Sequence, residues 1–124
     1  MDERRKHKRF RVKNGTFAVL SAISLPHSTQ KVGQITDISM GGLAFSYIAS
    51  EEPSNGSVQL SIFLGGNRFD LREIPFETIW DIETQEVRFR ALTMRRSGVQ
   101  FGKLTPHQIS QLKYFIQNYT IVEV

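Results

Sequence analysis

The sequence predicts a mainly β protein, an antiparallel barrel or sandwich, with a flexible basic arm before it and one α-helix after it. Short apolar runs follow one another with turn signals between them, no helical pattern interrupts them, and the end of the chain changes to a helical period. The 124 residues, 40% of them hydrophobic and 23% charged, have the size and composition of one globular domain. We therefore expect one core and one domain.

The arm, residues 1–10, comes first in the chain and carries much of its positive charge. Residues 1–13 hold seven of the 16 Lys and Arg against two acidic residues, so the rest of the chain is close to neutral within a net charge of +4. Like charges repel and favour an extended, flexible segment. A solvated charge run is the ordinary interpretation of such a segment, and Lys6 and His7 are expected to be exposed.

The barrel is expected over residues 11–104, and its first half contains three runs. Residues 16–25 are rich in strand formers and stop at Pro26. Residues 31–39 alternate imperfectly, whereas residues 43–48 place alternate apolar side chains on one face. All three are predicted strands, and residues 51–56 form a loop by composition.

The second half of the expected barrel supplies the remaining strands. Residues 57–64 alternate cleanly and break at Gly-Gly-Asn, a hairpin signal. Further strands are predicted at residues 76–82, 86–94 and 98–101. Aromatic residues occupy alternating strand positions, which is more typical of a core than of a stacking platform: Phe45, Phe63, Trp80 and Phe89.

The last element, residues 105–124, is predicted as a helix and a short tail. Thr105 as N-cap, Pro106 at the first helical position and Gln108 three residues after the cap form a capping-box pattern. An apolar stripe follows at helical spacing and predicts a face that packs on the barrel or on a partner. Its members are Ile109, Leu112, Ile116 and Tyr119.

Two motifs carry candidate chemistry. Arg5 and Arg9 lie four apart in the arm, a spacing that is weak evidence by itself. Asp37, Ser39 and Gly42 form an Asp-x-Ser-x-x-Gly stretch that is rare by chance. We expect an Asx-type turn in which a glycine supplies a positive φ. Such a turn would also be a preorganised polar site.

Both motifs, in this order on an all-β pattern, resemble the PilZ domain family of bacterial cyclic di-GMP receptors. The family signature is RxxxR in a basic N-terminal segment and (D/N)xSxxG at a strand-to-strand turn, and residues 95–104 also look like its closing strand. The resemblance covers nearly the whole chain. It implies a six-stranded antiparallel split barrel and a binding protein that needs no cofactor. Its implied ligand is cyclic di-GMP, which often binds in this family as an intercalated dimer.

The chemistry of these residues suits that ligand. Arginine can pair bidentately with the acceptor edge of guanine or grip a phosphate, and a carboxylate can accept from the donor edge of guanine. We therefore expect the arm to be one half of a clamp that orders over the ligand, with Phe10 and Val12 at its hinge. The resemblance implies main contacts from Arg5, Arg9, Asp37, Ser39 and Gly42, with auxiliary contacts from Arg4, Lys8, Arg11 and Gly41.

Several function classes are disfavoured. The chain has no cysteine, which excludes thiol chemistry and fits a reducing cytoplasm, and no run approaches the ~18 apolar residues of a membrane span. Its three histidines lack metal-ligand spacing and no nucleophile motif is present, so we expect no enzyme. We expect a cytoplasmic protein without membrane insertion.

Two alternatives stay open. A small barrel with a basic arm could bind single-stranded nucleic acid, although the near-neutral body disfavours this function. A PilZ-like module could also act through a partner without the nucleotide. In every case a single domain must pass its signal to an effector protein that the sequence does not identify. The arm, the helix and the tail at residues 120–124 are the candidate surfaces, and the family suggests motility, biofilm polysaccharide or virulence pathways.

Overall fold

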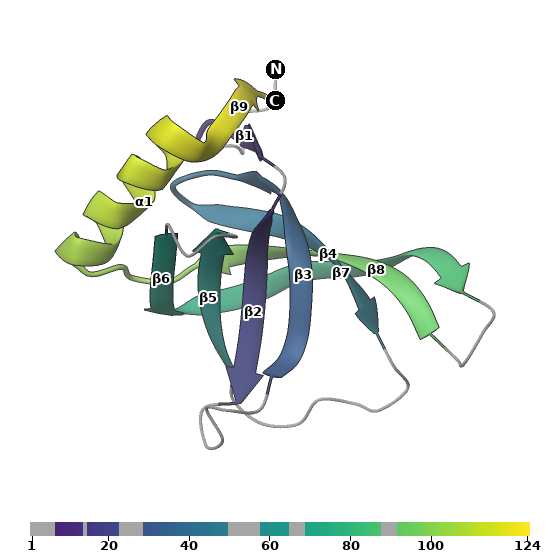
Figure 1. Ribbon diagram of the computed structural model, residues 1–124. Coiled ribbons are helices and arrows are strands. Elements are labelled where there is room, and N and C mark those ends of the chain that lie inside the picture. Colours follow the sequence, from purple (N-terminus) through teal and green to yellow (C-terminus); the bar gives the residue numbers. More distant parts are fainter. Residues whose placement is uncertain (1–6, 14, 23–28, 50–57, 65–68, 88–91) are drawn as a thin grey trace.

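A computed structural model describes residues 7–13, 15–22, 29–49, 58–64, 69–87 and 92–124 (Figure 1). Its centre is an antiparallel sheet that curls into a barrel, as the sequence predicts. The strands follow the spatial order β6-β5-β2-β3-β4-β8-β7. Their bounds are β2 Thr16–Ala22, β3 Thr29–Ile38, β4 Gly42–Ala49, β5 Val58–Leu64, β6 Phe69–Ile74, β7 Phe76–Val87 and β8 Leu92–Phe101.

Pro75 explains how these seven strands make the expected six-stranded barrel. It separates β6 from β7, and since proline has no N–H to donate, the ladder is interrupted there. On one side of the bend β6 pairs with β5, and on the other side β7 pairs with β8. Counted as one bent strand, β6 and β7 close a ring of six strands.

The sequence analysis missed β6. Asp70, Arg72 and Glu73 make its composition polar, and only Leu71 and Ile74 are buried among its described side chains. The register against β5 gains one residue between Leu71 and Ile74, and Glu73 adopts a φ of 57° there. This bulge breaks the alternation by which a strand is recognised in a sequence.

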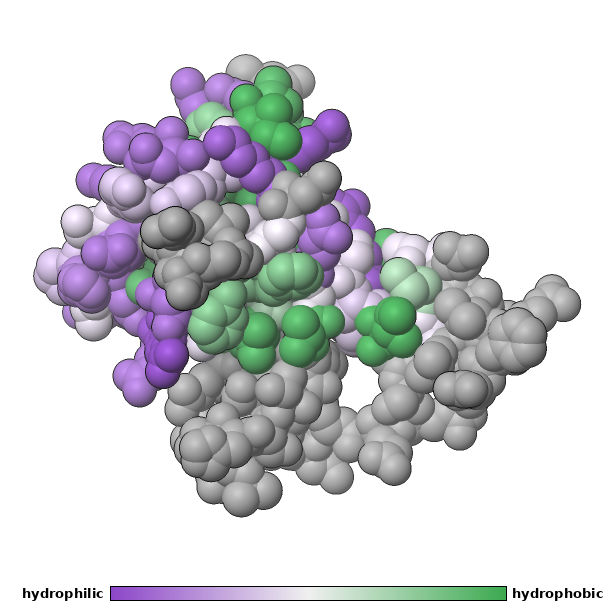
Figure 2. Space-filling view, viewed as in Figure 1, coloured by the Kyte–Doolittle hydropathy of each residue, from purple (hydrophilic) through white to green (hydrophobic). Residues whose placement is uncertain are grey.

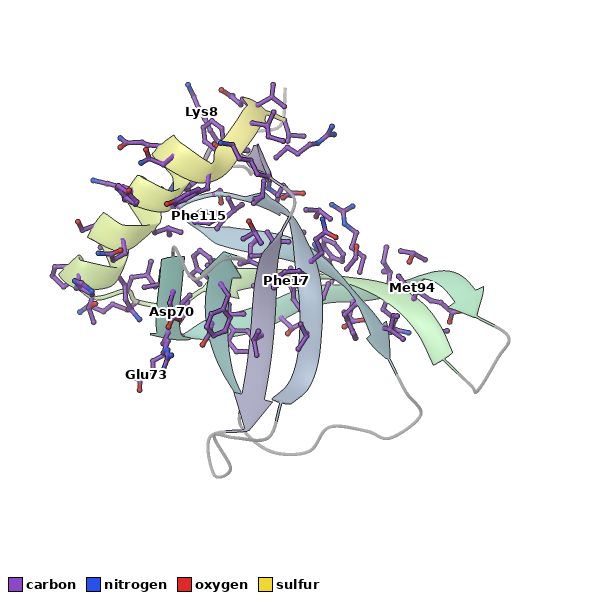
Figure 3. The ribbon with its side chains drawn as sticks, viewed as in Figure 1. Lys8, Phe17, Asp70, Glu73, Met94 and Phe115 are labelled. Carbon is purple, nitrogen blue, oxygen red and sulfur yellow. The ribbon has the colours of Figure 1, made fainter. Side chains whose placement is uncertain are left out.

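The core fills the barrel and continues under α1, Pro106–Tyr119. The predicted capping box is present, with Thr105 Oγ1 accepting from Gln108 N and Gln108 Oε1 accepting from Thr105 N. Leu112 and Phe115 are fully buried, and Figure 3 shows Phe115 between the helix and the barrel. The helix therefore packs on the barrel of its own chain.

The apolar stripe predicted for this helix was partly wrong. Leu112 is buried, and Ile116 and Tyr119 pack against the core, but Ile109 is exposed and Phe115 was not included. Gln108 fills the first barrel-facing position in place of Ile109. Its amide donates to the backbone oxygens of Arg72 and Glu73, which satisfies a buried polar group and ties the helix to β6.

Two short strands lie outside the ring and bring the described count to nine. β1, Phe10–Val12, pairs with β3 on one side and with β9, Thr120–Glu123, on the other. Figure 1 shows β1 and β9 together beside the C-terminal end of α1. The expected hinge at Phe10 and Val12 is thus a strand paired on both sides. In the described part of the chain, no helix is long and apolar enough to cross a membrane.

Candidate functional site

A cavity of about 550 Å³ lies where the described end of the arm meets the turn between β3 and β4. Strands β7 and β8 form the opposite wall. Three parts of the chain that are far apart in sequence therefore share one concave surface. Its lining is His7, Arg9, Asp37, Ser39–Ala44, Ile79, Trp80 and Gly98–Gly102.

Ser39 organises the turn. Its backbone N–H donates to Gly42 O at 2.8 Å, and its hydroxyl oxygen accepts from Gly41 N at 3.0 Å. Gly41 O in turn accepts from Phe101 N at 2.9 Å, which joins the turn to β8. Ser39 is itself buried, so its hydroxyl preforms the backbone of the site.

The glycines of the turn are required by close approach, not by a positive φ. Among the described glycines only Gly15 has a positive φ, so the expectation of one in this turn was wrong. A Cβ at Gly42 would lie 2.1 Å from Val99 O, and a Cβ at Gly41 would lie 2.6 Å from the imidazole of His7. Similarly, Gly98 leaves room for the indole of Trp80, which a Cβ would meet at 2.3 Å.

Asp37 joins the arm to the wall of the cavity. Its Oδ1 lies 4.0 Å from Nη1 of Arg9, and its Oδ2 lies 3.1 Å from Nη2 of Arg96 on β8. The Asp37 side chain is only 14% exposed, whereas that of Arg9 is 42% exposed. The carboxylate is therefore fixed from the barrel side, and the arm contacts it from the solvent side.

Arg96 contacts three neighbours at once. Besides Asp37, its Nη2 donates to Thr36 Oγ1 at 3.1 Å, and its guanidinium lies 5.7 Å from the ring centre of Trp80. Its Nε is buried and has no hydrogen-bond partner among the described residues. Arg96 thus connects the carboxylate of the turn with the aromatic wall of the cavity.

A second charged cluster supports β7 next to Trp80. Asp81 accepts hydrogen bonds from the Tyr47 hydroxyl and from Arg95 Nε. Burial, together with the Asp81 hydrogen bond and charge, raises the pKa of Tyr47 to about 12. The hydrogen bond to Asp81 likewise raises the pKa of Arg95. These hydrogen bonds link β7, next to the position of Trp80, to β4 and β8.

The structure brings together only part of the predicted site. Arg9, Asp37, Ser39, Gly41 and Gly42 line one cavity. Lys8 and Arg11 do not line it: Lys8 lies 4.0 Å from Glu123, and Arg11 is exposed on β1. Arg4 and Arg5 lie outside the described residues.

Sequence reasoning missed four residues of this region. His7, expected to be merely exposed, lines the cavity, and Trp80, expected in the core, is a half-buried part of its wall. Arg96 and Gly98 were not singled out. These residues could not be recognised from the sequence, because their place at the cavity depends on how the strands align. The registers that put Trp80 opposite Gly98 and Ser46 opposite Arg96 cannot be seen in the sequence of one strand.

Comparisons with known proteins agree with this architecture. A protein-family model described as "PilZ domain" matches residues 3–118. A solved structure described as "PilZ domain with c-di-GMP of YcgR from Escherichia coli" aligns with a TM-score of 0.64 and 19% sequence identity. The alignment covers 94% of this chain and 92% of that one, and at this identity it shows the fold. No curated protein sequence matches.

Proposed function

The chain belongs to the PilZ domain family, and on that premise we propose that it is a cyclic di-GMP receptor whose ligand binds between the arm and the turn after β3. The carrying observation is the meeting of Arg9 and Asp37 at one cavity, because the two motif halves are 28 positions apart in sequence. The complex of the structurally similar YcgR domain with c-di-GMP supports the same ligand class.

The state of Arg9 suits a clamp. At 4.0 Å its contact with Asp37 is an ion pair too long for a hydrogen bond, and the Arg9 side chain is partly open to solvent. The guanidinium therefore has donors available for a phosphate or for the acceptor edge of a guanine. Arg5, four positions earlier in the same motif, is proposed to contribute a second guanidinium.

The turn supplies the complementary half of the proposed site. Asp37 is held in place by Arg96 and can accept from the N1–H and N2–H₂ edge of a guanine. Gly41 puts backbone without a side chain at the cavity surface, so a planar base can approach closely where the exposed His7 ring turns away. Gly42 lets the turn lie directly against β8. Ser39 acts in this proposal by fixing that backbone, a role its buried hydroxyl already has.

We propose no catalytic step for this site. Ordering of the arm over the ligand is the proposed signal, and an effector protein is its proposed recipient. Two ligand molecules stacked on each other would satisfy more guanidinium groups than one, so a stoichiometry of two is compatible with the same residues.

Isothermal titration of the full chain with cyclic di-GMP tests the proposal, with GMP and cyclic di-AMP as controls. Arg9→Ala should weaken binding by about ten- to a hundredfold, the value of one charge-assisted contact. Arg72→Ala is the matched control, because this arginine is exposed on β6, pairs with Asp70 and does not line the cavity. No heat at about 100 μM cyclic di-GMP, or equal affinity of Arg9→Ala and Arg72→Ala, would contradict the proposed site.

A further inference from the structure

The backbone pairing between the barrel and the segment that carries Arg9 is short, although Val12 at the far end of that segment is buried in the core. β1 is three residues long and aligns with β3 at only two positions, Phe10 with Ile38 and Arg11 with Asp37. An isolated pairing of this length is marginal in water, because few hydrogen bonds offset the entropy of ordering the chain. Arg9 lies three positions before this buried residue, so the position of its backbone depends on further contacts.

β9 supplies those contacts along the whole segment. It aligns with all three residues of β1. The pairing extends past both ends of β1, because Val124 N donates to Arg9 O at 2.8 Å and Lys13 N donates to Tyr119 O at 3.1 Å. The backbone carbonyl of the candidate ligand-binding residue Arg9 is thus held directly by the C-terminal segment.

β9 is itself anchored through α1. The strand follows the helix without a loop, and Thr120 Oγ1 donates to Ile116 O at 2.6 Å at the junction. Leu112 and Phe115 fix the helix in the core. The side chains of β9, by contrast, are largely outside the core: Ile121 and Val122, and Val124 directly after the strand, are more than half exposed. Figure 2 shows hydrophobic residues on the surface in the region where Figure 1 places β9. The strand acts on β1 through its backbone.

From these contacts we infer that β9 is a positioning element of the ligand site, which holds the Arg9 backbone so that its guanidinium lies beside Asp37 at the cavity. This inference rests on the proposed function. Because coupling between two sites is reciprocal, a ligand gripped by Arg9 must in turn stabilise β9. The exposed C-terminal strand is then a part of the surface whose order depends on the ligand.

Val122→Pro is the test variant, with Val122→Thr as its matched control. Hydrogen-bonded positions alternate along an antiparallel pair, and since Val124 bonds opposite Arg9, Val122 opposite Arg11 is the next such position. Proline removes its N–H, whereas threonine keeps the backbone and the strand preference at an exposed side chain. Thermal unfolding should change little in either variant, because no β9 side chain belongs to the core.

Titration with cyclic di-GMP should give a dissociation constant roughly tenfold higher for Val122→Pro and unchanged for Val122→Thr, since fewer molecules have the arm in the competent position. Cyclic di-GMP should also slow hydrogen exchange at the Val124 amide of the parent protein but not of Arg9→Ala. If the parent protein binds cyclic di-GMP and Val122→Pro binds it with the same affinity, the inference is overturned and the receptor proposal stays intact. A parent that does not bind would overturn both.

Discussion

Arg96 and Asp37 form the fixed side of the candidate site, with Nη2 of the arginine 3.1 Å from Oδ2 of the carboxylate. The two residues come from strands that are not neighbours in sequence, β8 and β3, with β4 between them. The same guanidinium lies over Trp80, so one side chain sets the positions of an acceptor and of an aromatic wall. Arg9, on the other side of Asp37, is exposed to about the same extent as Arg96 but lies farther from the carboxylate, at 4.0 Å.

Arg96→Ala should therefore impair both stability and ligand binding. Removing the guanidinium leaves a carboxylate that is only 14% exposed without its 3.1 Å partner. Loss of one partner of such a part-buried charged pair is expected to cost about 1–3 kcal/mol in the free energy of unfolding, measured by urea denaturation. Arg96→Lys keeps the charge but not the planar contact with Trp80, so it should recover stability more fully than affinity for cyclic di-GMP. Full affinity in Arg96→Ala would contradict this role.

Gly41→Ala and Gly42→Ala should have different consequences although the positions are adjacent. The added methyl group at Gly42 would overlap a backbone oxygen of β8, which cannot move without breaking the sheet. We expect Gly42→Ala to lower the free energy of unfolding by about 1–3 kcal/mol or more. At Gly41 the methyl group would meet the exposed side chain of His7, which can turn away. Gly41→Ala should then keep the fold and weaken ligand binding by moving the His7 side chain from its observed place at the cavity.

Chemical denaturation and ligand titration of both glycine variants separate the two effects. A Gly41→Ala variant as unstable as Gly42→Ala would show that the turn tolerates no side chain at either position. Unaltered affinity in a stable Gly41→Ala variant would show that the site does not need His7 in its observed place.

The sequence was sufficient for the fold class, the capping box and the turn motif, because each depends on residues close together in the chain. It failed where strands from distant parts of the chain meet. Trp80 has the alternating position of a core residue, yet the space left by Gly98 on the neighbouring strand lets its indole form the cavity wall. Arg96 looks like one more surface arginine until the register of β4 with β8 places it near Asp37.

The helix shows the same limit at the level of one face. The helical periodicity predicted that Ile109 packs on the barrel. Phe115 is buried there instead, because Gln108 occupies the position nearest β6. Phe115→Ala should cost about 3–5 kcal/mol through a cavity in the core, whereas Ile109→Ala should cost less than about 1 kcal/mol. Urea denaturation of the two variants measures the difference, and equal losses would contradict the observed orientation of the helix.

The raised pKa of Tyr47 leads to a specific prediction for how stability depends on pH. Its pKa of about 12 in the folded protein lies above the ordinary value of 10.0, chiefly because the phenol is buried and also because it donates to Asp81. The folded state therefore binds this proton more tightly than the unfolded state. The associated stabilisation is fully present below pH 10 and is lost as the pH rises from 10 to 12. By pH 11 the loss in the free energy of unfolding amounts to about 1 kcal/mol.

Tyr47→Phe isolates this effect from the titration of other groups. The variant lacks the ionisable hydroxyl, so the difference in unfolding free energy between parent and variant should shrink between about pH 10 and 12. Urea denaturation at several pH values gives that difference, and tyrosinate absorbance reports the ionisation itself. A difference that stays constant over this range would mean that Tyr47 titrates alike in the folded and unfolded chains, and that its contact with Asp81 contributes no pH-dependent stability to the strands around Trp80.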